Sequence, residues 1–78
     1  MKKSGIIYSR QDCHLCHELY VELTKVYADL VDFSMRDIDE DIDLKKRYGL
    51  TIPVLTIDNI EIETRPVNHN HIRKILKL

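Results

Sequence analysis

The sequence predicts a single α/β domain built on a four-stranded mixed sheet with helices on both faces. Segments with the period of a strand and segments with the period of a helix follow one another in the order β-α-β-α-β-β-α. Strands joined through a helix are parallel, whereas a hairpin adds antiparallel strands. The chain of 78 residues is also too short for more than one hydrophobic core. We therefore expect residues 1–78 to form one domain.

The first half of the chain reads as a strand, a helix and a second strand. Residues 5–8 are a short apolar run, which indicates a strand buried on both faces. From Cys13 a helix is predicted, with Asp12 placed to cap it. Residues 31–36 alternate between apolar and polar side chains, which predicts a strand at the edge of the sheet. The apolar face of the predicted helix consists of Leu15, Cys16, Leu19, Tyr20, Leu23, Val26, Tyr27 and Leu30.

The second half reads as a short helix, a hairpin and a closing helix. Residues 39–47 begin with acids and end with bases, which suits the helix dipole, and Gly49 follows as the C′ residue that ends the helix. Residues 52–64 contain two extended runs around an Asp-Asn pair typical of a hairpin turn. Pro66 is expected at the first position of the last helix.

Two cysteines lie two residues apart at the predicted turn between the first strand and the first helix. The free N–H groups of a helix start stabilise a thiolate, and Cys13 is placed to receive them, while Cys16 lies one turn deeper on the apolar face. Lowering a thiol pKa from about 8.5 to about 7 requires about 2 kcal/mol, whereas a helix terminus contributes about 0.3–1 and at most about 2 kcal/mol, so the dipole alone is marginal. Asp12, His14 and His17 are therefore expected to tune the pKa of Cys13.

The same cysteines have several possible uses other than redox chemistry. A zinc site needs four ligands, but the chain has no second C-x-x-C, and His69 and His71 are too close together for the usual spacing. Residues 13–17 match the haem-attachment pattern, but no export signal precedes them and the predicted sheet offers no haem pocket. A further interpretation is that Cys13 and Cys16 are two buried small side chains or a chance pair without a chemical role. The alternative that we retain is a non-enzymatic iron–sulfur or metal carrier in which Cys13 from two copies binds the cluster.

These features resemble the glutaredoxins and the small glutaredoxin-like redoxins of the thioredoxin fold, over nearly the whole chain. The resemblance rests on the strand that ends at residues 8–9, on Arg10 three residues before Cys13, on the C-x-x-C motif and on residues 51–53 before the hairpin. It implies the thioredoxin-like, glutaredoxin-type arrangement of the predicted elements.

The resemblance also implies an activity and a set of site residues. The activity is that of a dithiol oxidoreductase in which Cys13 attacks a disulfide and Cys16 resolves the mixed disulfide, without a bound metal. Pro53 would be preceded by a cis peptide bond opposite the dithiol, and the backbone of Ile52 would pair with the extended substrate. The implied substrate-binding or glutathione-binding residues are Arg10, Thr51, Ile52 and Pro53.

Two departures from the glutaredoxin pattern leave the reductant open. His14 and Leu15 stand where glutaredoxins usually have Pro-Tyr, and residues 63–66 stand where they have Gly-Gly. Arg65 and Pro66 resemble an Arg-Pro pair of small redoxins that thioredoxin reductase reduces. We expect no bound cofactor. Either glutathione or a thioredoxin-reductase system would act as the reductant, and the substrates would be protein disulfides or glutathione mixed disulfides.

The charge and hydropathy of the chain exclude several classes of partner. Twelve Lys and Arg against thirteen Asp and Glu leave a net charge of −1, which does not favour a nucleic acid or an anionic membrane. No apolar run approaches the ~20 residues that span a bilayer, and the N-terminal apolar run is short for a signal peptide. We expect a cytoplasmic monomer, and in that reducing compartment two cysteines serve better as reactive thiols than as a permanent crosslink.

Overall fold

A computed structural model describes residues 2–78 and contains the predicted elements in the predicted order. The strands form one sheet in the order β2-β1-β3-β4, in which β1 and β2 are parallel and the other neighbours are antiparallel. The mixed sheet and the edge position of the second strand are therefore confirmed. The elements are β1 (Lys3–Ser9), α1 (His14–Tyr27), β2 (Val31–Asp37), the 3₁₀ turn η1 (Ile38–Glu40), α2 (Ile42–Tyr48), β3 (Val54–Ile57), β4 (Ile60–Ile62) and α3 (His69–Leu76).

Helices cover both faces of this sheet, as predicted. On one face, Ile7 and Leu55 are register partners and belong to a buried cluster with Leu23 of α1 and Ile72 of α3. On the other face, Tyr48 of α2 belongs to a smaller cluster that covers one end of the sheet. Successive side chains of a strand point to opposite faces, so the two clusters are separate layers of core.

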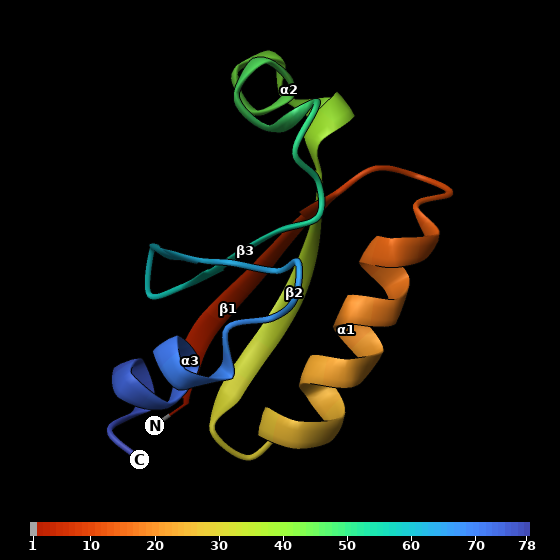
Figure 1. Cartoon of the computed structure of the whole chain (residues 1–78). Helices are drawn as coiled ribbons and strands as arrows, with labels where there is room; N and C mark the ends of the chain where they lie inside the picture. Colours follow the sequence, from red (N-terminus) through yellow and green to blue (C-terminus); the bar gives the residue numbers. More distant parts are fainter. Residues whose placement is uncertain (1) are drawn as a thin grey trace.

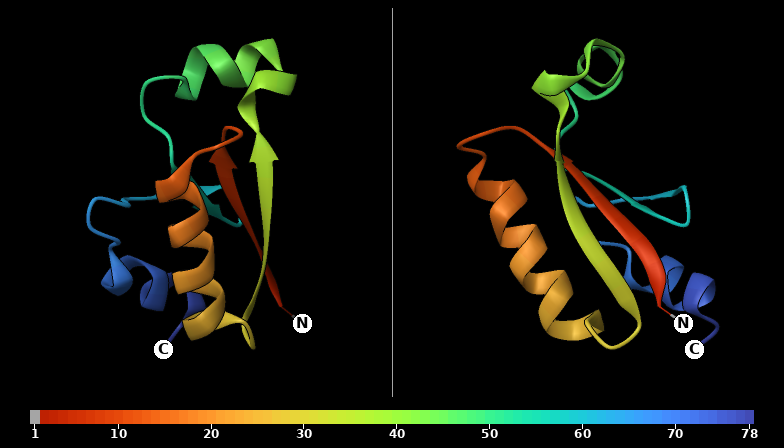
Figure 2. Two further views of the ribbon diagram at one scale, coloured as in Figure 1. Left: turned by 90° about the vertical axis from the view of Figure 1, so that its right-hand side faces the viewer. Right: turned by 180° about the vertical axis from the view of Figure 1, so that it is seen from behind.

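The two ends of the sheet differ in what they carry. Figure 1 shows α2 and the loop between β1 and α1 at one end, and both chain termini at the other. The two views of Figure 2 show the same arrangement. The parallel strands β1 and β2 both point toward the α2 end. This end therefore collects the loops that follow β1 and precede β3.

No helix within residues 2–78 is long and apolar enough to cross a membrane.

Helix α1 buries a narrower stripe than its sequence predicts. Its buried residues recur every three or four positions, which is the spacing of one helix face. Leu15 and Val26, which were predicted on this face, are each 60% exposed. They lie beside the stripe that the core covers, so the helix leaves them at the surface. The buried residues of α1 are Cys16, Leu19, Leu23 and Tyr27.

Two predicted helix ends are wrong in detail. Cys13, not Asp12, is the N-cap of α1, and Asp12 adopts a left-handed conformation with φ of 62° in the preceding turn. Gly49 does follow α2, but its φ of −55° is right-handed, so it is an ordinary C-cap and not a left-handed C′ residue. Asp41 is the N-cap of α2, and its side chain accepts hydrogen bonds from the N–H groups of Asp43 and Leu44 at 2.9 and 3.3 Å.

The closing helix begins later than predicted. Pro66 lies in a turn rather than at the first helical position, because a bridge between Thr64 and Val67 closes the chain on itself there. Helix α3 starts at His69, and the side chain of its N-cap Asn68 accepts a hydrogen bond from the backbone N–H of His71 at 3.1 Å. An Asn cap of this kind satisfies an N–H group that has no partner within the helix.

Gly5 lies within β1 at a point where the neighbouring strand leaves no room for a side chain. A Cβ there would lie 2.6 Å from Cδ1 of Phe33 and 2.9 Å from Cγ1 of Val31. We expect Gly5→Ala to lower the free energy of unfolding by about 1–3 kcal/mol, which is the usual cost of overpacking. Urea unfolding measures this difference. The exposed neighbour Ser4 provides the control, since Ser4→Ala should stay within about 0.5 kcal/mol of the wild type. Equal stabilities of the two variants would contradict the prediction.

Candidate active site

The C-x-x-C pair lies at the turn between β1 and α1, as predicted. The backbone N–H of Cys13 donates to the carbonyl of Arg10 at 3.2 Å, which closes the turn. The two cysteines form a disulfide with their Cα atoms 5.3 Å apart, within the usual range. Sγ of Cys13 accepts a hydrogen bond from the backbone N–H of Cys16 at 3.3 Å. A helix-start N–H therefore points at this sulfur, where it would stabilise a thiolate after reduction.

The two sulfurs differ in their access to solvent. Cys13 is half-buried at the edge of an open hollow, whereas Cys16 is completely buried. An external molecule can therefore approach the Cys13 sulfur, whereas the Cys16 sulfur is closed to solvent. Unequal access of this kind suits a nucleophile followed by a resolving thiol. The hollow is lined by Arg10, Asp12, Cys13, His14, His17 and Met35.

The three residues expected to tune the pKa of Cys13 surround this hollow. Asp12, His14 and His17 line it and are exposed. Nε2 of His14 lies 3.9 Å from Oε1 of Glu18, one turn further along α1. Charges in contact with solvent are screened, so their influence on Cys13 weakens as salt is added. By contrast, the backbone N–H of Cys16 contacts the Cys13 sulfur directly.

Arg10 lines the same hollow, but its side chain is held by Asp39. Nε of Arg10 donates to Oδ2 of Asp39 at 2.9 Å, and Nζ of Lys45 lies 3.9 Å from the other carboxylate oxygen. The side chains of Arg10 and Asp39 are 37% and 38% exposed. Exposed pairs of this kind contribute about 0–1 kcal/mol. A substrate carboxylate could therefore draw the guanidinium away from Asp39 at little cost.

The loop before β3 is held in place by the turn after β4. The Ile52–Pro53 peptide bond is cis, as the resemblance implied. The backbone N–H of Ile52 donates to the carbonyl of Tyr48 at 3.2 Å, and its carbonyl accepts from Nη2 of Arg65. Oγ1 of Thr64 donates to the carbonyl of Pro53 at 3.0 Å. Both backbone groups of Ile52 are thus bonded within the chain, and the guanidinium of Arg65 lies against the carbonyl with which an extended substrate would pair.

Thr51, the remaining predicted contact, lies on the outer side of this loop. Its side chain is exposed, and Oγ1 donates to the carbonyl of Tyr48 at 3.4 Å. It shares a shallow hollow with Leu50 and Arg65. The structure therefore brings Arg10 to one side of the dithiol hollow and places Thr51 beside Arg65, in a different hollow.

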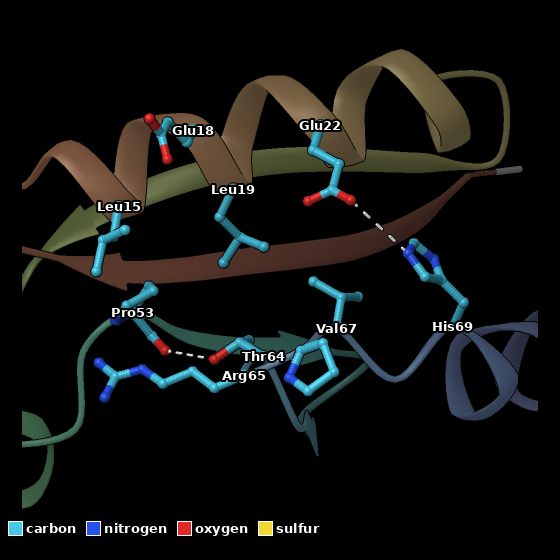
Figure 3. Close-up of a pocket in the computed structure, with 10 residues that line it drawn as sticks. Leu15, Glu18, Leu19, Glu22, Pro53, Thr64, Arg65, Val67 and His69 are labelled. Carbon is cyan, nitrogen blue, oxygen red and sulfur yellow. Dashed lines mark hydrogen bonds and ion pairs between the residues drawn. The ribbon is translucent and has the colours of Figure 1, made fainter.

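A groove runs between α1 and the turn that follows β4. Its volume is about 360 Å³. Figure 3 shows Leu15 and Leu19 pointing from α1 toward Pro53 and Val67 on the opposite wall. The sequence pattern does not reveal this groove, because its walls lie far apart along the chain and because Leu15 has the helical spacing of a core residue. Its lining consists of Leu15, Glu18, Leu19, Glu22, Pro53, Thr64, Arg65, Pro66, Val67 and His69.

His69 joins α1 to α3 at the far end of the groove. Its Nδ1 lies 2.6 Å from the hydroxyl oxygen of Tyr27, and its Nε2 lies 3.8 Å from Oε1 of Glu22 (Figure 3 shows the latter contact). Burial raises the pKa of the Tyr27 hydroxyl, against an opposing effect of the Arg73 charge. The nearby carboxylate of Glu22 raises this pKa further. The folded structure therefore favours the neutral form of the Tyr27 hydroxyl.

The raised pKa of Tyr27 predicts a loss of stability at alkaline pH. Because the folded-state pKa lies above the unfolded one, neutral Tyr27 stabilises the fold fully below the unfolded value of about 10, and this contribution disappears as the pH rises through the folded-state pKa. We expect Tyr27→Phe, which cannot ionise, to lose less unfolding free energy than the wild type above pH ~10. Urea unfolding across that range tests this. Parallel pH profiles would contradict it.

Potential metal ligands do not gather in the part of the chain that the structure describes. Among residues 2–78, no group of three or more His, Cys, Asp or Glu side chains is arranged to hold a metal ion. The iron–sulfur alternative draws its ligands from Cys13 of two copies, so it requires an experiment on the protein in solution.

The chain resembles a known protein family in sequence and a known protein in fold. A family model described as "Glutaredoxin-like domain (DUF836)" matches residues 6–77. Among solved structures, the oxidised thioredoxin from Plasmodium falciparum superposes with a TM-score of 0.50 and 15% sequence identity, covering 97% of this chain and 79% of that chain. At this identity the likeness shows the fold alone, which is that of thioredoxin. No curated protein matches the sequence.

Proposed function

The chain belongs to the glutaredoxin-like domain family, and from this premise we propose that it is a dithiol thiol-disulfide oxidoreductase. The family and the C-x-x-C pair support a redox function. The observation that carries the finer proposal is the unequal access of the two sulfurs. Cys13 is half-exposed at the start of α1, and the Cys16 sulfur to which it is bonded is completely buried.

The proposed reaction has two steps of thiol–disulfide exchange. The Cys13 thiolate attacks one sulfur of the substrate disulfide, forms a mixed disulfide and releases the other sulfur as a thiolate. Cys16 loses its proton and attacks the Cys13 sulfur, which releases the second substrate thiolate and forms the Cys13–Cys16 disulfide. Two electrons pass from the dithiol to the substrate, and the released thiolates take up protons from solvent. An external dithiol, or two molecules of a monothiol, must then reduce the protein.

The proposed substrates are protein disulfides or glutathione mixed disulfides in a reducing, cytoplasmic compartment. The proposed reductant is glutathione with glutathione reductase, or thioredoxin reductase, and no resident cofactor takes part. Arg10 supports the use of glutathione, because its guanidinium lies at the dithiol hollow in a weak exposed pair. Arg65 and Pro66 support the other pathway, because this pair resembles the Arg-Pro of small redoxins that thioredoxin reductase reduces.

The test measures recycling of the protein by the two reductase systems. NADPH consumption is followed with a disulfide substrate in one cuvette containing glutathione and glutathione reductase, and in a second containing thioredoxin reductase. Turnover in either cuvette supports the proposal, and the cuvette identifies the reductant. Acid-quench alkylation should also show that Cys13 reacts at lower pH than an ordinary thiol. No turnover in both cuvettes together with an ordinary Cys13 would overturn the proposal. Coloured protein with iron in proportion to chain, after purification without oxygen, would favour the carrier instead.

A further inference from the structure

We propose that the groove between α1 and the turn at residues 64–67 binds the polypeptide segment beside the substrate cysteine. The segment would carry an apolar side chain close to that cysteine, followed by a lysine or arginine. The inference rests on the proposed function, because it names the class of disulfide that the dithiol would reduce. It favours protein disulfides in a cationic context over the anionic tripeptide glutathione.

The position of the groove relates it to the dithiol. One end is formed by Leu15, which lies between the two cysteines in the sequence, and by Pro53 on the opposite wall. A polypeptide bonded through its cysteine to Cys13 would therefore have this opening close at hand. The volume of about 360 Å³ is within the range of sites that hold small ligands or a few side chains.

The walls near the dithiol are apolar. Leu15 and Leu19 face Pro53 and Val67 across the groove (Figure 3). Leu15 is 60% exposed, so in the free protein its side chain is left largely in water. An apolar side chain of the substrate would cover this surface, and removing apolar surface from water favours binding. The structure thus favours an apolar residue next to the substrate cysteine.

The wall formed by α1 becomes acidic further from the dithiol. Glu18 and Glu22 lie one helical turn apart, and their side chains are 64% and 53% exposed. Within residues 2–78, the ion-pair partner of each glutamate is a histidine nitrogen alone, at 3.9 Å for Glu18 and 3.8 Å for Glu22. On the other wall, the guanidinium of Arg65 is directed to the Ile52 carbonyl. The α1 side therefore attracts a cation and repels glutathione, whose two carboxylates and one ammonium group leave it negative at neutral pH.

The test compares two peptide disulfides that differ in one residue. Each peptide carries an apolar residue next to the cysteine and then either lysine or glutamate. We expect the wild type to reduce the lysine peptide with a kcat/KM about fivefold higher than the glutamate peptide, which corresponds to the upper range for an exposed ion pair. The ratio should approach one in about 0.5 M NaCl, because salt screens exposed charges.

Variants of the acidic wall locate the preference. Glu18→Gln should reduce the ratio, and the double variant E18Q/E22Q should bring it close to one. Glu18→Gln leaves the contact between Glu22 and His69 in place, so it separates charge from any effect on α3. The control is Glu61→Gln, an exposed glutamate of β4 outside the groove, which should keep the wild-type ratio. A ratio of one in the wild type, or a ratio that E18Q/E22Q leaves unchanged, would overturn the inference.

A binding measurement separates failure of the inference from failure of the proposed function. The lysine peptide with serine in place of cysteine cannot react, but it should shift the methyl NMR signals of Leu15, Leu19 and Val67, and the glutamate peptide should shift them less. These shifts without any disulfide reduction would support the groove and reject the oxidoreductase. Reduction without these shifts would reject the groove alone. Methyl shifts that depend on protein concentration, with no peptide present, would show that a second copy occupies the groove and would also reject the inference.

Discussion

Cys13→Ser should reduce disulfide reduction to the uncatalysed rate in every assay. A serine hydroxyl is not ionised at neutral pH and cannot form the mixed disulfide on which the reaction depends. The measurement is reduction of a protein disulfide and of a glutathione mixed disulfide, with circular dichroism to show that the variant is folded. Residual turnover well above the uncatalysed rate in folded Cys13→Ser would show that another group is the nucleophile.

Cys16→Ser should separate the two classes of substrate. Reduction of a protein disulfide normally needs both thiols, so it should be lost, and the mixed disulfide on Cys13 should accumulate and be detectable by mass spectrometry. A glutathione mixed disulfide should still be reduced weakly, because a second glutathione can resolve the intermediate. Arg10→Glu should weaken this remaining activity by about 1–3 kcal/mol, the value of a charge-assisted hydrogen bond. Cys16→Ser without glutathione activity, and Arg10→Glu without effect, would favour thioredoxin reductase as the partner.

Leu23→Ala should cause the largest loss of stability among single truncations on α1. Leu23 is 0% exposed and belongs to the buried cluster formed by α1, the sheet and α3. Removing a buried leucine side chain leaves a cavity and costs about 2–5 kcal/mol. In a domain of this size each kcal/mol lowers Tm by about 4–8 °C, so thermal unfolding will show the effect clearly.

Val26→Ala is the matched control on the same helix. Val26 was predicted in the core but is 60% exposed, so its truncation should change the free energy of unfolding by no more than about 0.5 kcal/mol. A similar loss in both variants would contradict the burial of α1 that the structure shows.

The order of the elements and the position of the dithiol could be predicted because their signals are local. Apolar periodicity over a few residues distinguishes strands from helices, whatever the rest of the chain does. The hairpin turn is another local signal, since Asp58 and Asn59 adopt φ of 51° and 66°, which asparagine and aspartate tolerate. The strand-to-helix turn followed from the same patterns. These patterns alone indicate that Cys13 lies at a helix start and that Cys16 lies on the buried face.

The surroundings of the dithiol depend on contacts that local patterns do not contain. The sequence shows Leu15 as one more apolar residue at helical spacing, and only the packing of α1 on the sheet decides that it stays exposed beside the cysteines. The same holds for the bond between Arg10 and Asp39 and for that between Arg65 and the carbonyl of Ile52, whose partners are 29 and 13 residues apart. By itself the sequence determined the type and order of the elements and where the thiols lie. The tertiary structure decided which side chains surround them, because burial and long-range hydrogen bonds depend on how the elements meet in space.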